Sequence, residues 1–162
     1  MSMEFNAFEA FQIAERIERN GAGFYRKAAE LFNDPDTCKM FLQLADWEKG
    51  HEGVFANMRK QLSEETPEQR IFKPEDVPFD PKAMAGLAVF GMRKDPSMEL
   101  SGRESIIDIL KMAVAKEKDS IVYYTGLREF VPAQAGKDKI DDIIKEEYRH
   151  IRILSQSLEQ RE

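Results

Sequence analysis

The chain of 162 residues is long enough for one domain with a sizeable hydrophobic core. Its net charge of −6 argues against nucleic acid or an anionic membrane as a partner, and no run approaches the roughly 20 apolar residues of a membrane span. The single cysteine, Cys38, excludes an internal disulfide and a cysteine-ligated zinc or rubredoxin-type iron site. The N-terminus lacks the basic start and apolar core of a signal peptide, so we expect a cytoplasmic protein.

The first part of the chain, about residues 6–62, is predicted to form a helical hairpin. Asn6 followed by Glu9 resembles a capping box at the start of its first helix. The segment Asn33-Asp34-Pro35-Asp36 ends that helix, and the second runs from about Thr37 to Leu62. Spacings of three and four residues give each helix an inward stripe. The stripes are Phe11, Ala14, Glu18, Gly21, Tyr25, Ala28 and Phe32, and then Phe41, Leu44, Glu48, His51, Phe55, Met58 and Leu62.

Residues 63–101 have a different composition, with five prolines separated by charged residues. Asp80 and Pro81 suit the start of one short helix that extends to about Met92. We interpret the stretch as a long crossover that packs on the helices through Phe72, Phe79 and Phe90. Because it contains no Gly/Ser-rich linker, residues 1–162 are predicted to form a single domain.

A second helical hairpin is predicted over about residues 102–160. Ser101 with Glu104 resembles a capping box, and Pro132 and Gly136 mark the turn between the two helices. No segment shows a convincing two-residue alternation, so the fold class is all-α, a four-helix bundle. The inward stripes are Ile106, Leu110, Ala113, Glu117, Ser120, Tyr124 and Leu127, and then Ile140, Ile143, Glu147, His150 and Leu154.

The two hairpins repeat one another around a glutamate in each stripe. Glu18 and Glu48 are 30 residues apart, and so are Glu117 and Glu147. His51 and His150, the two histidines of the chain, each follow a glutamate by three residues. The hairpins superpose at an offset of 99 residues, from Glu18 to Glu117, which indicates an internal repeat.

Four inward carboxylates require compensation, since together they would bring a charge of about −4 into an apolar core. Two divalent cations would balance that charge. Carboxylate and imidazole ligands without thiolate suit iron or manganese, with zinc as a possible substitute. The alternative is that the glutamates lie on solvated helix faces, but there they would occur among lysine and arginine rather than phenylalanine and leucine.

The motifs ERNGAGFY (18–25), EKGH (48–51), EKDSIVYY (117–124) and EYRH (147–150) resemble the rubrerythrin-like branch of the ferritin-like di-iron carboxylate superfamily. This resemblance implies a ferritin-like four-helix bundle that holds two iron ions. It implies that Glu48 and Glu147 bridge the irons and are central to catalysis. Glu18 with His51 would complete one iron, and Glu117 with His150 the other. Tyr25 and Tyr124 would hydrogen-bond ligand carboxylates.

Two departures from the family pattern affect the expected activity. The chain has no rubredoxin-like module with four cysteines, and Ser120 stands where rubrerythrin has an additional glutamate. The resemblance implies a homodimeric enzyme that reduces hydrogen peroxide or reacts with dioxygen and takes electrons from an external donor such as rubredoxin. A ferroxidase or iron-storage protein, and a metal-stabilised structural or sensory bundle, are the alternatives.

Two further positions have more than one interpretation. Gly21, with Ser120 opposite it in the repeat, is small enough either to leave room beside the metals for an oxidant or to allow close helix packing. Trp47 lies off its stripe and is interpreted as a packing or interface residue rather than an electron relay.

Overall fold

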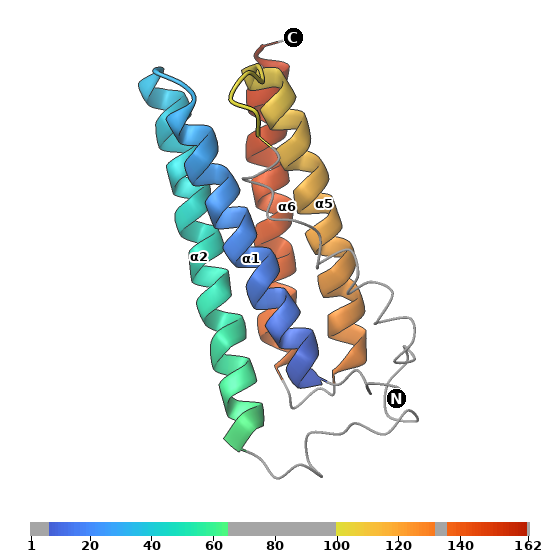
Figure 1. Ribbon diagram of the computed structural model, residues 1–162. Helices are drawn as coiled ribbons and strands as arrows, with labels where there is room; N and C mark the ends of the chain where they lie inside the picture. Colours follow the sequence, from blue (N-terminus) through green and yellow to red (C-terminus); the bar gives the residue numbers. More distant parts are fainter. Residues whose placement is uncertain (1–6, 65–99, 132–135, 162) are drawn as a thin grey trace.

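The computed structural model describes residues 7–64, 100–131 and 136–161, and within them every element is an α-helix. The helices are α1 (Ala7–Glu30), α2 (Pro35–Glu64), α5 (Ile106–Phe130) and α6 (Lys137–Glu159). Two antiparallel hairpins, α1–α2 and α5–α6, stand side by side to form an elongated bundle (Figure 1). Helix α1 packs on α2 and α5, and α6 packs on α5 and α2. The predicted all-α four-helix bundle is confirmed.

Several sequence predictions fall outside the described residues. They include the cap at Asn6, the crossover between the hairpins with its short helix, and the packing of Phe72, Phe79 and Phe90. Of the helices that are described, none is long and apolar enough to cross a membrane.

Helix α2 begins at Pro35, two residues before the predicted start at Thr37. The carboxylate of Asp34 accepts hydrogen bonds from the Thr37 amide at 3.1 Å and from the Thr37 hydroxyl at 2.5 Å. Proline fits the first helical position because its fixed φ suits the helix and an amide there has no intrahelical partner. The segment that breaks the apolar pattern is therefore also the start of the next helix.

Helix α5 begins at Ile106, so the predicted cap at Ser101 is wrong. Ser105 is the N-cap and forms a capping box with Asp108, with hydrogen bonds of 3.1 and 3.2 Å between each side chain and the other residue's amide. Ser101 and Glu104 instead stabilise a tight loop, in which Glu104 accepts hydrogen bonds from the amides of Ser101 and Gly102. Both pairs fit the Ser-x-x-acid pattern, and only the second one precedes a helix.

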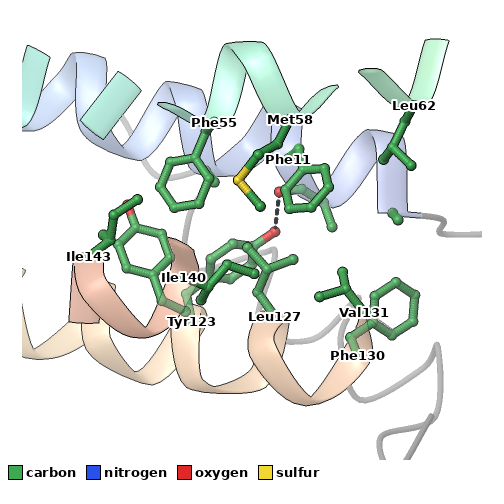
Figure 2. Close-up of a cluster of buried hydrophobic side chains, with 14 residues drawn as sticks. Phe11, Phe55, Met58, Leu62, Tyr123, Leu127, Phe130, Val131, Ile140 and Ile143 are labelled. Carbon is green, nitrogen blue, oxygen red and sulfur yellow. Dashed lines mark hydrogen bonds between the residues drawn. The ribbon is translucent and has the colours of Figure 1, made fainter. Parts of the chain in front are cut away.

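Two hydrophobic clusters fill the bundle, one toward each end. Figure 2 shows the first, in which Phe11, Phe55, Tyr123 and Leu127 come from three helices. The Tyr123 hydroxyl donates a 2.8 Å hydrogen bond to the carbonyl of Ala10, which satisfies a buried polar group (Figure 2). The second cluster gathers around Phe24, Tyr25, Phe41, Leu44, Leu110 and Leu154. Along each of the four described helices, the predicted glutamate lies between the residues of the two clusters.

The two candidate caps of α5 can be distinguished by mutation. We predict that Ser105→Ala lowers the free energy of unfolding by about 1 kcal/mol, because the helix loses the side chain that accepts from its first turn. Ser101→Ala is the matched control and should have a smaller effect. Urea unfolding of both variants measures the difference, and a larger loss for Ser101→Ala would contradict the assignment of Ser105 as the cap.

Candidate metal centre

A layer of ionisable side chains lies between the two hydrophobic clusters. It contains the six residues predicted from the repeat, and each has only 1–4% of its surface exposed. Helices α1 and α5 contribute one glutamate each, whereas α2 and α6 contribute a glutamate and a histidine one turn apart. The fold therefore brings together Glu18, Glu48, His51, Glu117, Glu147 and His150.

These side chains form two overlapping groups, and within each group one potential ligand atom per residue lies within 4.8 Å of the others. The first group is Glu18, Glu48, His51 and Glu147, and the second is Glu48, Glu117, Glu147 and His150. Glu48 and Glu147 belong to both groups. This is the arrangement that two metal positions with two shared carboxylates would need.

Both imidazoles direct Nδ1 toward the carboxylates. In His51 this nitrogen lies 2.8 Å from Glu147 Oε1 and 3.5 Å from Glu18 Oε2. In His150 it lies 3.2 Å from Glu48 Oε1 and 3.4 Å from Glu117 Oε1. Each histidine therefore faces a carboxylate of the opposite hairpin, so the cluster depends on the packing of the two hairpins.

The donor set fits a pair of divalent cations. Three buried carboxylate oxygens, Glu18 Oε2, Glu117 Oε2 and Glu147 Oε2, have no hydrogen-bond partner among the described residues. A buried polar atom without a partner is costly, and a carboxylate oxygen is especially so. Four carboxylates with two imidazoles and no thiolate form a ligand set that suits iron or manganese.

Burial and mutual repulsion control the protonation of the glutamates. Burial, together with the charge of Glu48, raises the pKa of Glu18 well above its usual value. The pKa values of Glu117 and Glu147 are raised for the same two reasons, burial and neighbouring carboxylates. Burial also acts on Glu48, but hydrogen bonds from its neighbours outweigh it and hold the pKa of that carboxyl well below its usual range. Without cations, protons must replace part of the missing positive charge.

The same environment favours the charged form of the two histidines. Burial lowers the pKa of His51, but hydrogen bonds to Glu18 and Glu48 outweigh it and raise the pKa to about 11. For His150 the interactions with Glu117 and Glu48 likewise outweigh burial and raise the pKa to about 9. In the metal-free protein both imidazoles are therefore cations at neutral pH and partly compensate the carboxylates.

Two tyrosines donate hydrogen bonds to carboxylates of the cluster. The Tyr25 hydroxyl on α1 donates to Glu117 Oε1 on α5 at 2.5 Å, and the Tyr124 hydroxyl on α5 donates to Glu18 Oε1 on α1 at 2.6 Å. Burial and the adjacent carboxylates raise the pKa of both phenols well above 10, so both keep their protons and remain donors. The reciprocal pair orients one oxygen of each unshared glutamate.

The small residues near the cluster leave little space. A Cβ atom on Gly21 would lie 3.6 Å from the Glu48 side chain, which is van der Waals contact. Alanine would therefore fit at this position, in contact with that carboxylate. The Ser120 hydroxyl donates at 3.0 Å to the carbonyl of Lys116 in its own helix, so it does not supply a ligand in place of the glutamate found in rubrerythrin.

Two contacts with the cluster were not predicted from the sequence, although Trp47 was interpreted as a packing or interface residue. The carboxylate of Glu146 is hydrogen-bonded to Nε2 of His51. The indole of Trp47 stacks on the imidazole of His150, with centroids 5.3 Å apart and planes 12° apart. The repeat offset of 99 residues pairs position 47 with position 146, and each directly precedes a shared glutamate. That correspondence relates the two positions in the sequence, but it does not predict what either residue contacts.

A groove of about 440 Å³ between α2 and α6 reaches the edge of the cluster. Trp47, Val54 and Ile143 give it apolar walls. Charged or polar groups include Asp46, Asn57, Lys139 and Asp142, and the His51–Glu146 pair borders the same space. Solvent and small molecules can therefore approach the buried layer from this side.

The metal-free protein should lose stability as the pH rises from 6.5 to 9. The histidines bind protons more tightly when folded, so their contribution is complete below their unfolded pKa near 6.5 and is lost as the pH approaches the folded values of about 9 and 11. The glutamates with raised pKa act in the same direction above pH 4.5, and Glu48 contributes a constant amount there. Urea unfolding of chelator-treated protein measures the trend, and a rise in stability across this window would contradict the clustering.

The chain matches no protein-family model and no curated protein. Among solved structures it is similar to a protein from Thermotoga maritima that is provisionally described as a ferritin-like diiron-carboxylate protein. The two chains are 25% identical, each is covered over 100% of its length, and the TM-score is 0.68. The four-helix bundle, its buried Glu/His layer and this likeness together support the ferritin-like superfamily of diiron-carboxylate proteins for this chain.

Proposed function

We propose that the protein is a non-haem di-iron oxidoreductase of the rubrerythrin-like type, which reduces hydrogen peroxide at a site of four glutamates and two histidines. The observation that carries this proposal is the pair of overlapping buried groups that share Glu48 and Glu147. Glu18 and His51 would complete one metal position, and Glu117 and His150 the other. Manganese or zinc could occupy the same ligands.

Each residue of the cluster has a role that follows from its contacts. A bound pair of ferrous ions would supply two electrons, and reducing one peroxide to two waters requires these two electrons and two protons from solvent. Glu48 and Glu147 reach both groups and would keep the two positions close together. Tyr25 and Tyr124 donate to Glu117 and Glu18, and so fix which carboxylate oxygen stays free to bind metal.

Continued turnover requires electrons from outside the chain. With one cysteine, the chain cannot form a four-cysteine rubredoxin module of its own. We therefore propose, from the resemblance to rubrerythrin, an external electron donor such as a separate rubredoxin, and a homodimer as the assembly. The groove between α2 and α6 offers the small oxidant a path to the buried layer.

A ferroxidase or iron-handling role is the second candidate, and Ser120 is the observation that favours it. Rubrerythrin has an additional glutamate at that position, whereas the Ser120 hydroxyl is committed to the Lys116 carbonyl. A centre with one carboxylate fewer differs from the one on which the peroxidase resemblance rests. Reaction with dioxygen, and transfer of the oxidised iron, would then be the favoured chemistry.

Metal binding is the first test of both candidates. We predict that the protein binds two iron ions per chain and that the double variant Glu48→Ala, Glu147→Ala loses most of this binding, because both positions lose a shared ligand. The control is the double variant Glu30→Ala, Glu159→Ala, which removes the same charge from exposed positions at the ends of α1 and α6. Metal analysis after anaerobic reconstitution measures the stoichiometry. Two ions retained in the first double variant would contradict the ligand assignment.

The choice of oxidant separates the two candidates. We predict that the reduced, iron-loaded protein is oxidised faster by one equivalent of hydrogen peroxide than by one equivalent of dioxygen, as the rubrerythrin resemblance implies. Stopped-flow mixing followed by ferric absorbance measures both rates. Turnover should be slow with the protein alone and should increase when reduced rubredoxin is added. A clearly faster reaction with dioxygen would favour the ferroxidase instead.

A further inference from the structure

The candidate ligands are the same residue types in both halves of the internal repeat, but the residues that contact the two histidines from positions 47 and 146 are different. Position 47 precedes Glu48 and position 146 precedes Glu147, so the two are equivalent at the offset of 99 residues. One is a tryptophan and the other a glutamate. Each contacts the histidine of the opposite hairpin: Glu146 contacts His51, and Trp47 contacts His150.

Glu146 contacts the edge of the His51 ring. Nε2 of His51 is hydrogen-bonded to the Glu146 carboxylate, while Nδ1 faces Glu147 and Glu18. A metal held at Nδ1 would leave the remaining ring proton on Nε2, which would donate it to this carboxylate. Such a partner fixes the orientation of the ring and makes the other nitrogen a stronger metal ligand.

Trp47 contacts His150 in a different way. The two rings are nearly parallel, with 12° between their planes, so the indole covers the face of the imidazole. An indole has one N–H donor and no acceptor, so it cannot take a proton from the edge of the histidine ring. Stacking restrains the tilt of His150 but adds no negative charge beside it. Trp47 therefore gives the ligating nitrogen of His150 none of the electronic support that Glu146 gives to His51.

We infer that the two metal positions are unequal, with the position formed by Glu18 and His51 the tighter one, and that Glu146 is the positioning residue responsible. This inference rests on the proposed two-metal function. The shared glutamates contribute to both positions alike, and the tyrosine hydrogen bonds are reciprocal, so neither feature distinguishes the positions. The contacts of positions 47 and 146, by contrast, differ between the two histidines.

A competing explanation for tighter binding at this position is that any acidic side chain near the groove attracts the metal cation. Asp142 provides a control, because it lies one turn before Glu146 on α6 and lines the same groove. Asp142→Asn and Glu146→Gln remove the same charge from nearby points. Glu146→Gln also keeps the size of the side chain at a half-exposed position, where the helix tolerates the change.

The experiment is an anaerobic titration of the metal-free protein with cobalt(II), followed by visible absorbance. We expect two resolved binding steps in the wild-type protein. Glu146→Gln should weaken the tighter step by about 10- to 100-fold and leave the weaker one in place. Asp142→Asn should leave the ratio of the two constants unchanged. His51→Ala should remove the tighter step and His150→Ala the weaker one, which assigns each step to a position.

A second measurement reports the hydrogen bond itself. In zinc-loaded protein with ¹⁵N-labelled histidine, the Nε2 proton of His51 should resonate downfield of that of His150. Glu146→Gln should shift the His51 signal upfield and leave the His150 signal in place. A loss of structure alone would move both signals.

Several outcomes would overturn the inference. They are two equal affinities in the wild-type protein, equal weakening of both steps by Glu146→Gln, the same change in Asp142→Asn, or loss of the tighter step in His150→Ala. In each case two metals still bind and the proposed function stands. A protein that binds no cobalt, zinc or iron would contradict both.

Discussion

Repulsion among four buried carboxylates is the constraint on which the rest of the structure depends. Each glutamate interrupts an apolar stripe, so the hydrophobic clusters on either side force all four into one layer. The resulting charge is compensated within the layer by two histidines and by protons, and two divalent cations would complete the compensation. The stability of the bundle and the affinity of the site are thus linked through the same side chains.

The hydrogen bonds of the layer also decide how the hairpins pair. Tyr25 and Tyr124 cross between α1 and α5 in opposite directions, and the histidines of α2 and α6 each face a carboxylate of the other hairpin. Apolar packing alone would allow the hairpins to slide by a turn. A one-turn shift would separate these pairs and leave several buried polar groups unsatisfied, so the polar layer specifies the register that the clusters stabilise.

Much of the layer could be predicted from the sequence, since helical periodicity converts spacing directly into direction. A glutamate in step with phenylalanine and leucine must point inward, and its repetition at equal spacing places four such residues at one level. The start of α5 could not be decided in this way. Ser101 with Glu104 and Ser105 with Asp108 share one pattern, and the choice depends on where the chain enters the bundle rather than on either motif.

Trp47 and Glu146 show the same limit at the site. Each lies beside its stripe, where a helical wheel alone cannot distinguish a surface residue from one that leans across to the neighbouring helix. What they contact depends on the packing of α2 against α6, which is a property of the assembled bundle. The internal repeat does relate the two positions, but it predicts similarity, and here the residues differ.

This difference follows from the physical demands on each position. The four buried glutamates share one charge balance, so replacing any of them disturbs the whole layer, and both halves of the repeat contain them. Positions 47 and 146 contact one histidine each and are in part exposed, with 36% of Trp47 accessible. A change there alters the contacts of a single histidine without leaving a charge buried. Gly21 and Ser120 are also equivalent in the repeat and also differ in their contacts. Gly21 adjoins Glu48, whereas the Ser120 hydroxyl bonds to the carbonyl of Lys116 in its own helix. The bundle can therefore keep a symmetric set of candidate ligands while their surroundings diverge, and that divergence is what would give the two halves of the centre different properties.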